Sequence, residues 1–532
     1  MSSLAAPLTL LSLVFIPLLI RFVGKAVGSN IRSKTEQRRN ILLTNAAKEE
    51  SDRKTDIDAE WEKVEKSGPG IANGAEAGKE WDGVIGFFHP FCNAGGGGER
   101  VLWAAIRATQ NRWPSALCVV YTGDHDADKA AILRNVQNRF NIHLNAPRIV
   151  FLYLSTRQYV LASTWPRFTL LGQSLGSLAL AWDAFNLIVP DIFIDTMGYA
   201  FTLAFSKFLF PTVPTGAYVH YPTISTDMLE SLDDQSSSHG VNAGLGKGWK
   251  GTLKRVYWKL FAWLYGWVGG EVDVVMTNST WTQNHVRQLW GKSRLKKGRT
   301  SPIEVVFPPT AVRELEEAIE VSSESEKQRK PYLLYIAQFR PEKNHHTIIT
   351  AFAEFKRNNA AMFKGVDPPK LVLVGSVRDD TDKMLVYKLR VLAREEHVAD
   401  DVEFVVNAKW SQILDWLRMS SIGVNGMWNE HFGIGVVEYQ AAGLISVVND
   451  SGGPKLDIVV EIDSRPTGFH ATSSSDFAAR FKDALSLSPA ETLAMRQRAR
   501  KSALRFTEEV FRDKWLAQTG KLIQLQIKQN SK

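Results

Sequence analysis

The sequence predicts an α/β protein made of two doubly wound domains that face each other across a cleft. An apolar strand at residues 84–88 leads through a loop with four consecutive glycines into a helix at 101–106. Strand, glycine loop and helix in this order begin a doubly wound domain. A second alternation of short apolar strands and helices starts at residue 332. A chain of 532 residues is long enough for each alternation to form its own domain.

The composition is that of an ordinary globular protein, with 44% hydrophobic and 23% charged residues. The net charge of +8 is spread over a long chain without a basic tract, so nucleic-acid binding is not indicated. The sequence has two cysteines, Cys92 and Cys118. Two cysteines exclude a disulfide framework and a cysteine-rich zinc site, and they fit a reducing compartment.

Residues 1–24 are predicted to form a transmembrane anchor. The first 20 residues carry no charged side chain, and a bilayer span needs about 20 residues. A cleaved signal peptide is the alternative, although no basic residue precedes the apolar run. Positive charge follows at Arg21 and Lys25, so the positive-inside rule places the rest of the chain in the cytosol. Residues 25–80, which hold few large apolar groups, are predicted to form a polar stalk.

The N-terminal domain is assigned to residues 81–310. Its glycine loop, Gly95 to Gly98, lets the backbone approach a ligand and can point successive N–H groups at an anion. A flexible turn is the alternative, but the position between strand and helix favours ligand binding. His220 is predicted at the carboxyl end of a strand, where open α/β sheets bind ligands. A lone histidine is more often structural, so its location is what favours a functional role.

Aromatic and basic residues alternate between residues 249 and 267, with Trp258 and Trp263 among them. Such a segment suits a bilayer interface, where the rings lie at headgroup depth and lysines extend toward water. A helix packed on the sheet is an equally good explanation of the pattern.

Residues 311–330 are charged and are predicted to link the two domains. Residues 331–500 are assigned to the C-terminal domain. The remaining residues, 501–532, are predicted to form a C-terminal helix that could return to the N-terminal domain.

Two glutamates of the C-terminal domain, Glu430 and Glu438, stand eight positions apart with two glycines between them. We predict the first in a loop and the second in the first turns of the helix that follows. Carboxylates there could bind hydroxyl groups, and the helix N-terminus favours an anionic group. A sugar nucleotide offers both kinds of group. A solvated pair of glutamates is the alternative.

These motifs resemble the family-4 retaining glycosyltransferases of the GT-B architecture, in which two Rossmann-like domains face a cleft. The signature with seven residues between two glutamates is Glu430 to Glu438. The blocks at 89–103, 338–345 and 449–457 narrow the resemblance to α-1,2-mannosyltransferases of the asparagine-linked glycosylation pathway. The resemblance covers the chain from about residue 81 to its end.

The resemblance implies a hexosyltransferase that uses GDP-mannose and a dolichol-diphosphate-linked oligosaccharide, to which it adds the fourth and fifth mannoses. It also implies a single-pass protein of the endoplasmic reticulum membrane with cytosolic catalytic domains, and other mannosyltransferases of the pathway as partners. A transferase that uses another nucleotide sugar, or a catalytically dead binding module in the membrane, is the alternative.

Residue roles are carried over from the family position by position. Glu430 is expected to contact the hydroxyls of the donor hexose, Glu438 the ribose, and Lys343 the diphosphate. The family arginine usually stands where this chain has Gln338, so Arg340 is a candidate in its place. The expected catalytic residues are Glu430, Lys343 and His220. The other expected donor-binding residues are Glu438, Arg340, Gln338, His431, Phe432, Gly433, Gly452 and Gly453. The expected acceptor- or phosphate-binding residues are His89, Gly95, Gly96, Gly97, Gly98, Glu99 and Arg100.

No metal and no cofactor are expected. Lysine, arginine and helix termini can meet the charge of the departing diphosphate, and such preorganised donors lower the barrier. The acidic run at 379–382 is interpreted as a solvated turn. Retention of configuration is implied by the resemblance.

Overall fold

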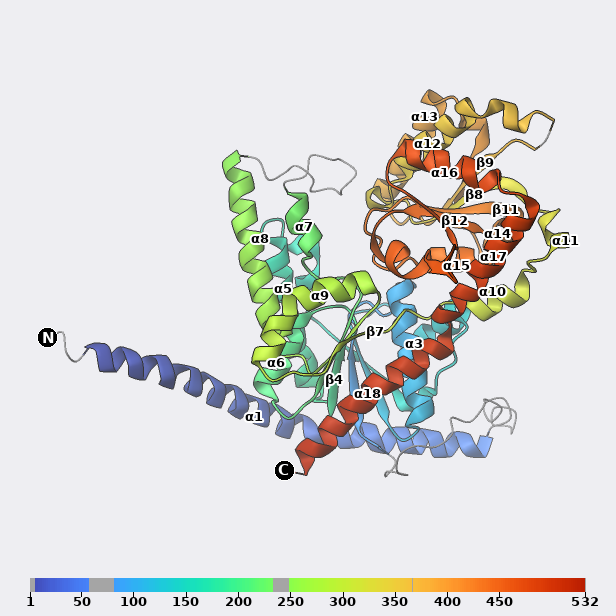
Figure 1. Cartoon of the computed structure of the whole chain (residues 1–532). Coiled ribbons are helices and arrows are strands. Elements are labelled where there is room, and N and C mark those ends of the chain that lie inside the picture. The colour runs from blue at the N-terminus through green and yellow to red at the C-terminus, as the bar shows by residue number, and fades with distance from the viewer. Residues whose placement is uncertain (1–4, 57–80, 233–247, 366, 532) are drawn as a thin grey trace.

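A computed structural model describes residues 5–56, 81–232, 248–365 and 367–531 of the chain. It has two α/β domains, one built on each of two parallel sheets (Figure 1). This architecture confirms the predicted fold class.

The N-terminal domain holds a seven-stranded parallel sheet in the order β3-β2-β1-β4-β5-β6-β7. Most residues of its strands are apolar and buried, because helices cover both faces of a parallel sheet. The strands are β1 (Val84–Phe88), β2 (Leu117–Thr122), β3 (Ile149–Tyr153), β4 (Ile192–Asp195), β5 (Thr215–Val219), β6 (Val274–Thr277) and β7 (Ile303–Val305). Its helices are α3 (Gly97–Arg112), α4 (Lys129–Phe140), α5 (Thr169–Leu187), α6 (Ala200–Leu209), α7 (Thr226–Ser231), α8 (Gly248–Gly269) and α9 (Thr280–Lys296).

The C-terminal domain holds a six-stranded parallel sheet in the order β10-β9-β8-β11-β12-β15. The strands are β8 (Lys330–Ile336), β9 (Lys370–Gly375), β10 (Val402–Val406), β11 (Ser420–Asn425), β12 (Ile445–Asn449) and β15 (Gly468–Ala471). The helices are α10 (Val312–Ala318), α11 (Ser323–Glu326), α12 (His345–Asn358), α13 (Asp380–Glu395), α14 (Trp410–Met419), α15 (Ile434–Ala441), α16 (Ser474–Leu485) and α17 (Pro489–Ala503). A small hairpin of β13 (Glu461–Ile462) and β14 (Arg465–Pro466) lies between β12 and β15 in the sequence.

The last helix, α18 (Glu508–Asn530), leaves the C-terminal domain and crosses the N-terminal one (Figure 1). It packs against α3, and the fully buried Trp515 donates from its indole Nε1 to Thr109 Oγ1 at 3.1 Å. The Trp515 ring stacks on Phe87 of β1 at a centroid distance of 6.3 Å. The core of the N-terminal domain is therefore completed by the C-terminal end of the chain.

The N-terminal helix α1 (Ala5–Asp56) lies against the N-terminal domain over much of its length. Ile31 and Ala46 are buried, and Arg39 pairs with Asp191 at 2.7 Å. The start of the segment predicted as a stalk is thus part of the folded domain, while residues 57–80 lie outside the described residues.

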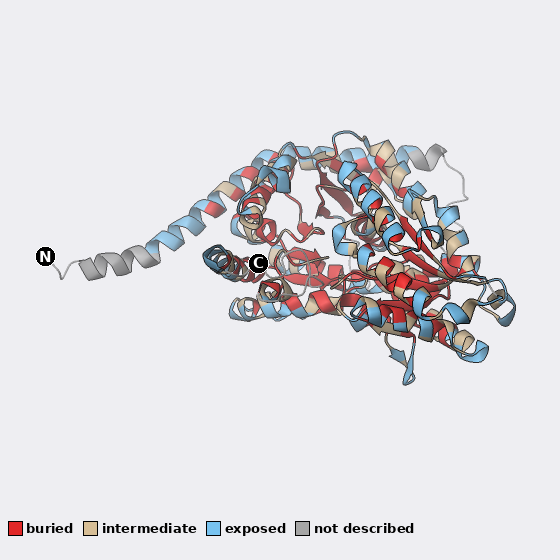
Figure 2. Cartoon of the chain, turned by 90° about the horizontal axis from the view of Figure 1, so that it is seen from above, coloured by how far each residue is buried: buried red, intermediate tan, exposed pale blue. Residues whose placement is uncertain are grey.

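The more N-terminal residues of α1 project away from the domain, and their described side chains are mostly exposed (Figure 2). Among the helices that the structure describes, none combines the length and apolar character needed to cross a membrane. The anchor predicted for residues 1–24 therefore has no support from the structure, and residues 1–4 fall outside the described part.

The aromatic segment forms helix α8, which has one buried face and one exposed face. Trp258, Phe261 and Tyr265 are buried against the domain. The opposite face carries an exposed apolar stripe of Trp249, Leu253, Val256, Leu260, Trp263 and Trp267. Successive members stand three or four positions apart, which is the spacing of one helix face. The helix thus packs on the domain with one face and presents an exposed apolar stripe on the other.

Candidate active site

The glycine loop brings the two domains together. Gly97 begins α3, and a Cβ atom added there would lie 2.7 Å from Ile434 Cδ1, the first residue of α15. Gly95 has a φ of 82°, which favours glycine. The N-termini of α3 and α15, one from each domain, therefore meet at the cleft. Helix N-termini carry partial positive charge and unpaired N–H groups, so the pair suits an anion.

Glu99 and Arg100, which are predicted to bind acceptor or phosphate, both have partners within the protein. The buried Glu99 carboxylate accepts a hydrogen bond from the Gly96 N–H at 2.7 Å, and so caps α3. Arg100 pairs with Glu508 of α18 at 3.0 Å. The first is used to shape the glycine loop, and the second joins α3 to the returning helix.

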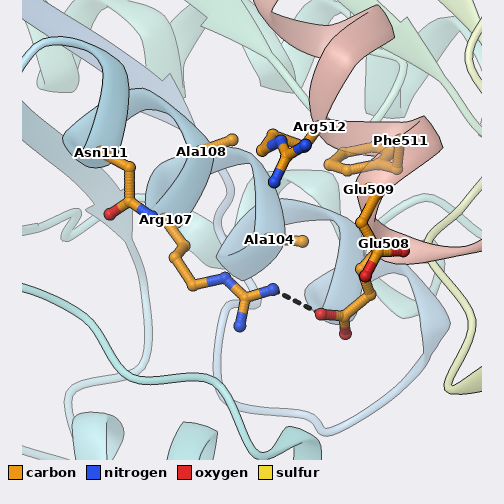
Figure 3. Close-up of a pocket in the computed structure, with 8 residues that line it drawn as sticks. All are labelled: Ala104, Arg107, Ala108, Asn111, Glu508, Glu509, Phe511 and Arg512. Atoms are coloured by element: carbon orange, nitrogen blue, oxygen red, sulfur yellow. Dashed lines mark hydrogen bonds and ion pairs between the residues drawn. The ribbon is translucent and has the colours of Figure 1, made fainter. Parts of the chain in front are cut away.

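A pocket of about 190 Å³ lies between α3 and α18 (Figure 3). Arg107 on one wall pairs with Glu508 on the other. None of the predicted site residues lines this pocket. It is a gap between two packed helices outside the candidate site.

Two histidines of the N-terminal domain lie beside the glycine loop. A Cβ atom added at Gly98 would lie 3.7 Å from His220 Nε2. His89 is fully buried, and its Nδ1 is 2.7 Å from Thr196 Oγ1. Burial lowers the pKa of His89 to about 3 and that of His220 to about 4. Both imidazoles are therefore neutral at physiological pH.

Glu430 and Lys343 form the central ion pair of the C-terminal domain. The Lys343 Nζ lies 2.5 Å from Glu430 Oε2 and 3.1 Å from Met427 Sδ. Burial alone would raise the pKa of Glu430, but Lys343 outweighs it and holds this pKa below its ordinary value. Glu430 is thus an ionised carboxylate, able to accept hydrogen bonds from sugar hydroxyls and unsuited to donating a proton.

Glycines position the loop that carries Glu430. A Cβ atom added at Gly452 would lie 2.3 Å from Glu430 O, and the Gly453 N–H donates to that oxygen at 2.8 Å. Gly433, with a φ of 103°, is the N-cap of α15. Gly452 and Gly453 pack against the loop backbone, where no side chain fits, and the donor contact predicted for them stays a prediction.

Three further residues that are predicted to bind the donor, Phe432, Gln338 and Arg340, have different surroundings in the structure. The Phe432 ring is buried against Phe307 at a centroid distance of 5.7 Å, so the side chain belongs to the core, and the donor contact predicted for its backbone N–H stays a prediction. Gln338 is exposed at the end of β8. The Arg340 guanidinium lies 3.7 Å from Glu342 Oε1, and its phosphate role stays a prediction.

Sequence reasoning missed three N-terminal-domain residues that contact the Glu430 loop, namely Asp227, Tyr221 and Trp281. No local motif marks them, because their role depends on contacts across the domain boundary. The described residues contain no group of three or more His, Cys, Asp or Glu side chains that could hold a metal. Asp379 of the acidic run caps α13 by accepting from the Asp382 N–H at 3.0 Å.

Glu438 gives the site a predicted pH dependence. Burial raises its pKa to about 7, an effect that Arg100 opposes and Glu314 reinforces. Below about pH 7 the carboxyl is mostly protonated and has one acceptor oxygen fewer for the hydroxyls of the ribose that it is predicted to bind. GDP-mannose affinity, measured by calorimetry without acceptor, is therefore expected to rise as pH increases through about 7. The Glu438→Gln variant should bind more weakly at pH 8 and lose this dependence, and a wild-type slope in that variant would contradict the assignment.

Comparison with known proteins finds mannosyltransferases or glycosyltransferases as relatives of both domains. Residues 82–290 match the family described as "ALG11 mannosyltransferase N-terminus", and residues 317–503 match "Glycosyl transferases group 1". A relative from Neurospora crassa, named "GDP-Man:Man(3)GlcNAc(2)-PP-Dol alpha-1,2-mannosyltransferase", is 60% identical over 98% of this chain and 96% of its own length. The chain belongs to this mannosyltransferase family.

A human relative of the same name is 45% identical, over 82% of this chain and 87% of its own. Among solved structures, a sucrose-phosphate synthase from Thermosynechococcus elongatus matches with a TM-score of 0.58 at 14% identity, over 83% of this chain and 98% of its own. At that identity the likeness concerns the fold. Membership of the mannosyltransferase family therefore rests on the sequence matches, and the solved structure supports the two-domain architecture.

Proposed function

We propose that this protein transfers mannose from GDP-mannose to a dolichol-diphosphate-linked oligosaccharide, forming α-1,2 linkages, and that it adds the fourth and fifth mannoses. The observation that carries this is the Glu430–Lys343 pair at the cleft, beside the facing N-termini of α3 and α15. The names of the relatives identify the same donor and acceptor for those proteins.

The residues of the cleft suit the two charges that the reaction develops. Breaking the bond between the anomeric carbon and the phosphate oxygen leaves positive charge on the sugar and negative charge on GDP. The ionised Glu430 suits the sugar hydroxyls, while Lys343 and the α15 N-terminus suit the diphosphate. These groups can meet the phosphate charge, so we propose a reaction without a metal. The departing phosphate can accept the proton of the incoming hydroxyl on the same face, which gives retention.

The test is transfer by the purified protein from GDP-mannose to a synthetic lipid-linked Man3GlcNAc2. We expect products one and two mannoses heavier, detected by mass spectrometry and sensitive to an α-1,2-mannosidase. GDP should compete with the donor far better than UDP. Stronger inhibition by UDP would assign another nucleotide sugar, and binding without any product would indicate an inactive module.

We also propose that the protein works at the endoplasmic reticulum membrane, with the exposed stripe of α8 in contact with lipid. Lys254 and Lys259 on the same helix would lie near anionic headgroups. Association with other mannosyltransferases of the pathway remains a prediction.

Replacing both Trp249 and Trp263 by glutamate should weaken binding to anionic vesicles at least about 10-fold, because two exposed rings lose their burial in lipid. Sedimentation with vesicles measures this. Met384→Glu, on the C-terminal domain, is the control, since Met384 is also exposed. Trp258→Glu is unsuitable because this ring is buried. Equal binding by the double variant and the control would remove α8 from the membrane contact.

A further inference from the structure

The loop that presents Glu430 is held by both domains at once. Within its own domain, Lys343 pairs with Glu430. The residues on either side of Glu430, Asn429 and His431, turn instead to the N-terminal domain. The loop can therefore have its present set of contacts only when the two domains lie together.

Asp227 of α7 is the polar centre of this contact. Its Oδ2 accepts from Asn429 Nδ2 at 2.5 Å and from Trp281 Nε1 at 3.2 Å, and it lies 3.4 Å from His285 Nε2. His285 is held in turn by Thr226, whose Oγ1 is 2.8 Å from its Nδ1. Burial would raise the pKa of Asp227, but the hydrogen bond and charge of His285 outweigh it and lower this pKa. One carboxylate oxygen of Asp227 thus accepts hydrogen bonds from residues of both domains.

His431 adds an apolar contact beside this polar one. Its ring stacks on Tyr221 at a centroid distance of 4.1 Å and an interplanar angle of 24°. It also stacks on Trp281 at 5.3 Å and 22°. Burial lowers the pKa of His431 to about 4, so the stacked imidazole is neutral. The loop is consequently held at the two residues that flank Glu430, Asn429 and His431.

The backbone of the loop is fixed from within the C-terminal domain, while the Asn429 side chain reaches the other domain. Asn429 has a φ of 52°, an unfavourable region for a residue with a side chain, although asparagine tolerates it better than most. The Asn429 N–H donates to Ser451 Oγ at 2.7 Å, so its own domain fixes the backbone while Asp227 fixes the side chain.

We propose that Asp227 is a positioning residue of the transferase: by accepting from Asn429 across the cleft, it latches the two domains together and fixes the loop that offers Glu430 to the donor sugar. This inference rests on the proposed function for its kinetic readout. Since the latch stabilises the closed arrangement, its loss lowers the fraction of molecules competent to bind donor, and apparent affinity falls by the same factor.

The test compares Asp227→Ala, Asn429→Ala and the double variant, with Glu230→Ala as the control because Glu230 is an exposed carboxylate on the same helix. Each single variant should raise the KM for GDP-mannose about 10- to 100-fold, the range for losing a charged hydrogen bond, while kcat changes less than 3-fold. The double variant should have a KM no higher than that of Asp227→Ala, because the Asp227–Asn429 hydrogen bond is already lost in each single variant. Asp227→Asn, which keeps a neutral acceptor, should recover part of the loss.

A second readout does not require turnover. Amide hydrogen exchange at residues 428–433 should accelerate at least about 10-fold in Asp227→Ala and remain unchanged in Glu230→Ala. Unchanged exchange in Asp227→Ala, or effects of the two single variants that multiply in the double variant, would overturn the latch. If wild-type protein transfers no mannose but the exchange result holds, the proposed function fails and the latch stands.

Discussion

Replacing Lys343 with alanine is expected to lower mannose transfer at least about 100-fold. Lys343 is the cation that Glu430 touches at 2.5 Å, and in the proposed reaction it meets the negative charge of the departing diphosphate. One preorganised donor of this kind contributes about 3 kcal/mol to the transition state. Without it, the partly buried Glu430 carboxylate also loses its partner, and its pKa should rise. Initial rates at saturating GDP-mannose measure the effect, which should lie mainly in kcat.

Glu430→Ala should cause a loss of similar size. The double variant should lose much less than the product of the two single effects, since the residues act as a pair. Lys388→Ala is a suitable control, because Lys388 is an exposed lysine of the same domain. Near wild-type rates for both single variants would show that the chemistry lies elsewhere in the cleft.

Replacing Trp515 with alanine should lower the free energy of unfolding of the N-terminal domain by about 3–5 kcal/mol, the usual cost of removing a fully buried aromatic side chain. The ring is 0% exposed, stacks on Phe87 and Phe511, and donates to Thr109. Its removal leaves a cavity between α18 and the sheet, and Thr109 Oγ1 keeps only its hydrogen bond to the Ala105 carbonyl oxygen. Urea unfolding followed by circular dichroism measures the shift.

Trp182→Ala serves as the control for that experiment. Trp182 lies in α5 of the same domain and is 45% exposed, so its loss should cost far less. A loss below about 1 kcal/mol for Trp515→Ala would mean that α18 contributes little to the N-terminal core.

The sheets could be predicted from sequence because their strands carry their own signal. Residues 84–88 are apolar throughout, and in a parallel sheet both faces are covered, so the run itself identifies a buried strand. The position of Glu430 in a loop and of Glu438 in the following helix was likewise predicted, since Gly433 marks the helix start. Local sequence was sufficient in each case.

Features that depend on distant contacts could not be predicted in the same way. In the sequence, Glu99 looks like a carboxylate that is free to bind a ligand, but in the structure it accepts a hydrogen bond from the Gly96 N–H. Trp258 and Trp263 look alike in the sequence, but the packing of α8 buries only the first. The partner of Asn429 is 202 residues away in the chain, beyond the range of any pattern of spacing.

The crossing of α18 also constrains the order in which the chain folds. Residues of β1, including Ile85 and Phe87, share one core with Trp515 and Leu522 near the C-terminus. Domains usually fold as units during synthesis, the N-terminal one first. Here the first domain must wait for the last segment to leave the ribosome, and until then an apolar groove stays open. Nascent or truncated chains should therefore be better chaperone and protease substrates than the finished protein.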